Sequence, residues 1–63
     1  MPNIMDLSEA LALEGRMAQE YLDLGKQVKS KSGKKEMKTL VDLSKKKMAI
    51  LLDLIKKGNW NVK

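Results

Sequence analysis

The sequence predicts an all-α protein: an antiparallel two-helix hairpin that pairs with a second copy to form a four-helix bundle. Two stretches repeat apolar residues with a helical period, and one short polar stretch containing a glycine separates them. No stretch shows the strict alternation that is typical of strands. We interpret residues 1–63 as a single domain with a helix at about 6–29, a turn at 30–33, a helix at about 34–57 and a tail at 58–63.

The first predicted helix is amphipathic around Glu14. At 100° per residue, six residues fall within about 60° of Glu14: Leu7, Leu11, Ala18, Tyr21, Gly25 and Val28. Asp6 is the expected N-cap, because Glu9 three residues later completes a capping-box-like pattern. Asn3 is the alternative N-cap.

The second predicted helix begins after the turn, with Ser32 as a plausible N-cap. Its apolar arc is centred on Leu51 and includes Met37, Leu40, Ser44, Met48, Leu54 and Ile55. Gly58 is placed as the residue that follows the helix end. Trp60 is expected to fold back as an apolar plug over one end of the bundle, and an exposed binding residue is the alternative.

The small size of the chain favours self-association. A core of this size rarely supplies more than about 3–5 kcal/mol of net stability, and the sequence of 63 residues has no cysteine for disulfides. Each predicted apolar arc is also wider than one partner helix can cover. We therefore expect a homodimer or a higher even oligomer.

Glu14 has a counterpart of opposite sign in the second helix. Lys47 lies about 40° from the centre of the apolar arc of that helix. An antiparallel turn near residue 31 brings Glu14 to about the same height as Lys47. Because a buried charge needs a partner, we predict a buried Glu14–Lys47 ion pair, within one hairpin or across the dimer. Tyr21, Met48 and Leu51 would form the supporting core. Alternatively, Lys47 extends to the edge of the bundle.

The segment Glu14-Gly15-Arg16-Met17-Ala18-Gln19-Glu20-Tyr21 resembles the first-helix motif of rubrerythrin-like and ferritin-like proteins. In that family a metal-binding Glu is followed seven residues later by a Tyr on the same face. The segment Leu40 to Ile50 looks like the family's second-helix stretch, which carries a Glu-x-x-His ligand pair. The resemblance covers roughly residues 7–57 and implies a ferritin-like four-helix bundle with a hairpin as its half.

The resemblance breaks at the metal ligands. The family's second Glu falls on Lys47 and its His falls on Ile50, so only Glu14 remains of the expected ligands. We therefore expect no metal centre and no cofactor, with the Lys47 ammonium in place of the metal charge. The alternative is a residual protein that binds iron or another divalent metal weakly through Glu14.

Catalytic chemistry has little support in the sequence. The chain has no histidine to activate its serines, and its glycines do not fit a phosphate loop. We expect a non-enzymatic structural or interaction module. No apolar run approaches the length of a membrane span, so a cytoplasmic protein is the expectation.

The charge is unevenly distributed along the chain. Residues 1–29 carry three basic and five acidic side chains, a net charge of −2, and residues 30–63 carry ten lysines and three acidic side chains, a net charge of +7. A nucleic-acid partner is the weaker alternative function, because this half has no arginine for bidentate phosphate contacts. The basic patch that it would use consists of Lys31, Lys34, Lys35, Lys38, Lys45 and Lys46.

Overall fold

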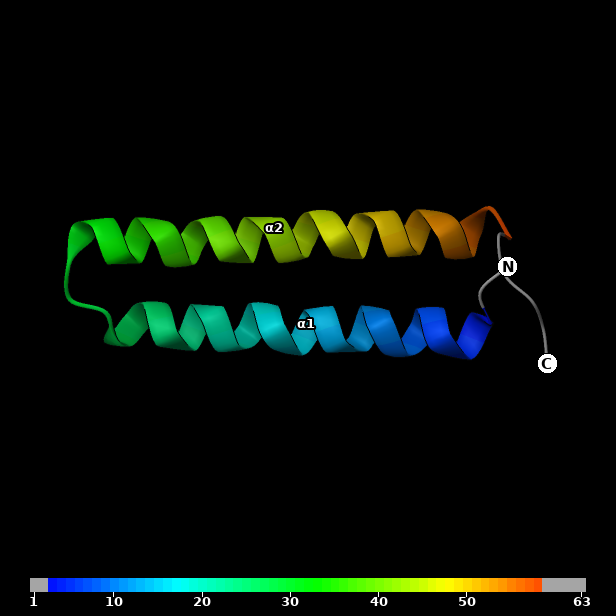
Figure 1. Ribbon diagram of the computed structural model, residues 1–63, viewed down its shortest axis with the longest axis horizontal. Helices are drawn as coiled ribbons and strands as arrows, with labels where there is room; N and C mark the ends of the chain where they lie inside the picture. Colours follow the sequence, from blue (N-terminus) through cyan, green and yellow to red (C-terminus); the bar gives the residue numbers. More distant parts are fainter. Residues whose placement is uncertain (1–2, 59–63) are drawn as a thin grey trace.

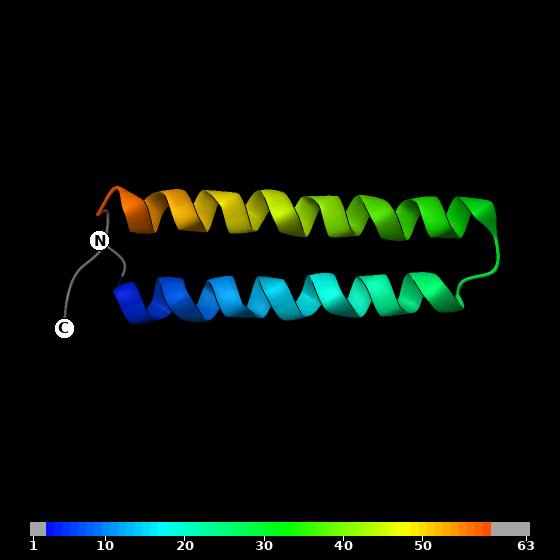
Figure 2. The same cartoon turned by 180° about the vertical axis from the view of Figure 1, so that it is seen from behind.

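The protein is an all-α hairpin. The computed structural model describes residues 3–58, which form helix α1 (Ile4–Gln27) and helix α2 (Lys31–Lys56). The helices run antiparallel, side by side in a single layer, and a short connection joins them at one end (Figures 1 and 2). The Cα atoms span 46 × 15 × 13 Å. The prediction for Trp60 lies outside the described residues.

Both helices begin earlier than the sequence pattern predicts. The Asn3 side chain caps α1 by accepting a hydrogen bond from the backbone N–H of Met5 at 2.7 Å, so Asp6 lies inside the first turn. The Ser30 hydroxyl caps α2 by accepting from the N–H of Gly33 at 3.0 Å. The residues that we expected in the turn after Ser30 therefore form the first turn of α2, and Ser32 is not its cap.

Gly33 explains why the connection is so short. A Cβ atom at this position would collide with Cγ1 of Val28 and lie 2.8 Å from the Ser30 hydroxyl oxygen. A side chain at this position would force the Val28 or Ser30 side chain to move, so glycine suits the tight turn before α2. At the other end of α2, Gly58 adopts a φ of 71°, a conformation that glycine accepts readily.

The contact between the helices depends on small side chains in the middle of the hairpin. Ala18 and Ser44 are both buried and come to the same height, one turn beyond the approach of Gly15 to Met48. The other buried residues between positions 3 and 58 are Leu7 and Val41. A single layer of two helices shields only the facing line of each helix, so most of both apolar arcs is left half-buried or exposed.

Candidate functional site: an ion pair between an apolar face and a basic groove

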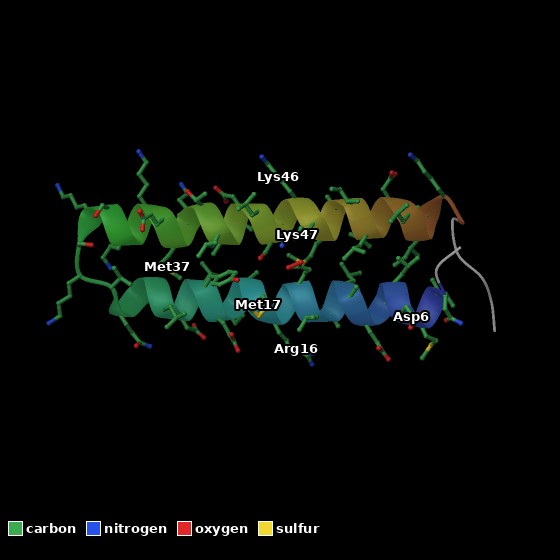
Figure 3. All side chains as sticks on the ribbon, in the orientation of Figure 1. Asp6, Arg16, Met17, Met37, Lys46 and Lys47 are labelled. Carbon is green, nitrogen blue, oxygen red and sulfur yellow. The ribbon has the colours of Figure 1, made fainter. Side chains whose placement is uncertain are left out.

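Glu14 and Lys47 meet within one hairpin. The Nζ atom of Lys47 lies 3.6 Å from Oε2 of Glu14. In Figure 3, Lys47 points from α2 toward α1, whereas its neighbour Lys46 points away from α1. The antiparallel register thus brings together the two charged residues that interrupt the apolar arcs of α1 and α2.

The two partners differ in their burial. The Glu14 side chain is 20% exposed, whereas the Lys47 side chain is 64% exposed. We expected a buried pair, but in the single hairpin the Lys47 end of the pair is exposed. Lys47 reaches Glu14 from the surface along its alkyl stem. At 3.6 Å the contact is an ion pair without a hydrogen bond.

Large apolar side chains lie on the same side of the hairpin as Lys47. We call this surface the apolar face and define it by five exposed residues: Leu13, Leu24, Leu40, Leu43 and Ile50. On α2, Leu43 and Ile50 lie one turn to either side of Lys47. The half-buried Met17 and Leu54 extend the surface. Five of the eight exposed large hydrophobic residues therefore share one face.

The opposite side of the hairpin carries an open groove of about 440 Å³ between the two helices. We call it the basic groove, and its lining includes Tyr21, Leu22, Val41, Lys26, Lys38 and Lys45. Leu22 and Leu24 lie on opposite flanks of α1, about 160° apart, and only Leu22 lines the groove. The flank of α2 with Val41 and Lys45 meets the Leu22 flank in the groove, so the Leu24 and Leu43 flanks share the other face.

The predicted basic patch is divided by the structure. All six of its lysines are exposed, and Lys34, Lys38 and Lys45 line the basic groove. Lys31, Lys35 and Lys46 do not line it. Lys26 of α1, which was not part of the predicted patch, lines the groove from the other helix. Its position near the C-terminus of α1, just before a turn, is the feature that would have indicated it.

The three residues predicted to support the ion pair, Tyr21, Met48 and Leu51, are half-buried rather than buried. Tyr21 lines the basic groove, and the Met48 sulfur lies where a Cβ added to Gly15 would contact it at 3.9 Å. These residues therefore contribute to the contact between α1 and α2 without being enclosed by it.

The donor set around Glu14 does not fit the metal centre of the family that the sequence resembles. An ammonium group, not a second carboxylate, lies beside the Glu14 carboxylate, and Ile50 offers no lone pair. Over residues 3–58, no three carboxylates gather in a cluster that could hold a metal ion.

No family model, no curated protein and no solved structure matches the chain. Neither α1 nor α2 is long and apolar enough to cross a membrane.

Proposed function

We propose that the protein is a non-catalytic helical hairpin that pairs with a second copy through the apolar face, forming a ferritin-like four-helix bundle without a metal centre. In this role it is a structural or interaction module. The observation that carries the proposal is the collection of exposed leucine and isoleucine side chains on one face of the hairpin. A gathering of exposed large apolar side chains on one face is typical of protein interfaces.

The single-layer fold supports the same pairing. Two helices side by side leave most of both apolar arcs half-buried or exposed. A second hairpin laid on the apolar face would supply a second layer and cover these side chains.

The charges of the apolar face are compatible with a two-fold arrangement. Glu14 and Lys47 lie near the middle of the long axis, so two-fold pairing brings two ion pairs close to the centre of the bundle. Each ammonium group then has carboxylates from both copies nearby. Burial of Lys47 is tolerated in the dimer because its charge is compensated there.

A matched pair of α1 variants tests the proposal. Leu24→Lys places a charge on the apolar face, and Leu22→Lys makes the same change on the basic-groove side. Both leucines are 47% exposed in the single hairpin. We expect Leu24→Lys to weaken dimerisation by about tenfold or more, as for an apolar anchor at an interface. Leu22→Lys should leave the dimer intact.

The readout is the mass of the native protein by light scattering over a concentration series. Circular dichroism establishes that both variants keep their helices. A wild-type chain that is monomeric throughout the series overturns the proposal. Equal weakening by both variants also overturns it, because pairing would then not use the apolar face.

A further inference from the structure

We infer that the basic groove is a docking site for an acidic amphipathic helix of a partner protein. The groove lies on the side of the hairpin opposite the apolar face, so it stays open whether or not the chain pairs with itself. The inference therefore does not depend on the proposed dimer. It assigns the lysine-rich half of the chain a partner of defined chemistry.

The groove has the length and shape to hold a helix. Its residues on α2 run from Lys34 to Lys45, a distance of about 16 Å along the axis, or three helical turns. Val41, which is almost fully buried, forms part of its floor, and the half-exposed Leu22 stands at its edge. An apolar trough of this length, bounded by two helices, fits a third helix that presents one apolar stripe.

The rim of the groove is positively charged. Lys26 stands on the α1 side, and Lys38 and Lys45 stand on the α2 side. These three ammonium groups have no ion pair or hydrogen bond with any residue between 3 and 58. The Lys34 ammonium group has a partner within the hairpin, because its Nζ donates to the carbonyl oxygen of Gly25 at 3.1 Å. Asp42 is the single acidic residue that lines the groove.

The combination of floor and rim indicates the occupant. A helix with carboxylates on both flanks of its apolar stripe would meet Lys26 on one side of the groove and Lys38 and Lys45 on the other side. Lys38 and Lys45 are two helical turns apart. A nucleic acid fits less well, since its phosphate backbone leaves the apolar floor and Leu22 uncovered. The lining also has no arginine and only Tyr21 as an aromatic platform.

A designed peptide tests the inference directly. The probe is a fluorescent synthetic helix of about three turns, roughly 11 residues, with leucines on one stripe and glutamates on both flanks. A peptide of the same composition in scrambled order is its control. We expect the amphipathic peptide to bind the full-length protein, to bind more weakly as salt is added, and to exceed the scrambled peptide in affinity.

Two charge-reversal variants locate the binding. Lys38→Glu with Lys45→Glu removes the α2 rim, and we expect it to lower peptide affinity by about tenfold or more. Lys35→Glu with Lys46→Glu makes the same charge change on α2 outside the groove, and we expect a much smaller loss. Circular dichroism checks the fold of both variants. The monomeric form expected of Leu24→Lys should still bind the peptide, which separates this result from the test of pairing.

Three outcomes would overturn the inference. The first is equal loss of binding in both double variants, and the second is equal binding of the scrambled peptide. In the third, a single-stranded oligonucleotide or anionic lipid vesicles bind more tightly than the peptide and depend on Lys38 and Lys45. That result would assign the groove to a polyanion rather than to an acidic helix.

Discussion

The ammonium group of Lys47 lies 3.6 Å from the carboxylate of Glu14, although the Lys47 side chain is 64% exposed and the Glu14 side chain only 20%. The carboxylate is held between the helices, and the cation reaches it from the apolar face. An exposed pair of this kind contributes about 0–1 kcal/mol. A second hairpin on the apolar face would cover Lys47 and increase the coupling energy between Lys47 and Glu14.

This difference predicts a concentration-dependent coupling energy. In a double-mutant cycle of Glu14→Gln and Lys47→Met, we expect less than about 1 kcal/mol of coupling where the chain is monomeric. Coupling should exceed about 1 kcal/mol where the chain is dimeric, because removing one partner then leaves a buried charge uncompensated. Urea unfolding at several protein concentrations measures both values. A coupling energy that does not change on dimerisation would argue against burial of the pair.

The resemblance to ferritin-like proteins predicts that a metal site can be restored. Lys47→Glu combined with Ile50→His returns the missing ligand pair, and we expect about two divalent cations per dimer. Native mass spectrometry after exposure to iron, manganese and zinc counts them, and the wild-type dimer should carry none. The matched control is Lys46→Glu with Ala49→His, which places the same residue types with the same spacing away from Glu14. Metal binding by the control alone would contradict the predicted alignment.

Two helical glycines should respond oppositely to alanine. At Gly15 a new Cβ meets only the Met48 sulfur at 3.9 Å, so Gly15→Ala should raise the free energy of unfolding by about 0.5–1 kcal/mol. At Gly33 the same methyl group collides with Val28. Gly33→Ala should therefore destabilise the protein despite the better helix propensity of alanine. Thermal unfolding of both variants compares the signs, and stabilisation by both would mean that the tight connection is not required.

The observed cap of α2 gives a prediction with a neighbouring control. Ser30→Ala removes the acceptor for the Gly33 N–H and should lower the free energy of unfolding by about 0.5–2 kcal/mol. Ser32→Ala changes an exposed residue inside the first turn, where we expect an effect within about 0.5 kcal/mol. Chemical denaturation distinguishes the two. A larger loss of stability in Ser32→Ala would identify Ser32 as the N-cap, as the sequence pattern predicts.

The sequence pattern was informative where local chemistry decides the structure. The two amphipathic periods predicted the α1–α2 hairpin, and the glycine at position 58 marked the end of α2. The caps were less predictable, because Asn3 and Asp6, like Ser30 and Ser32, are all acceptable N-cap residues. At the start of α2 the choice depends on how tightly the chain turns, and there the Ser30 hydroxyl accepts from the N–H of Gly33, the glycine that fits beside Val28.

The helical period of the sequence is sufficient to assign which residues share a side of each helix, including the two charges inside the apolar arcs. The rotation of the helices relative to each other is seen only in the folded hairpin. That rotation places Lys47 within reach of Glu14, leaves Leu24 and Leu43 together on one face, and joins Lys26 to Lys38 and Lys45 on the other. The helical period sets the position of each residue around its own helix axis. It does not set how the two helices are rotated toward each other, which depends on the packing of buried small residues such as Ala18 and Ser44.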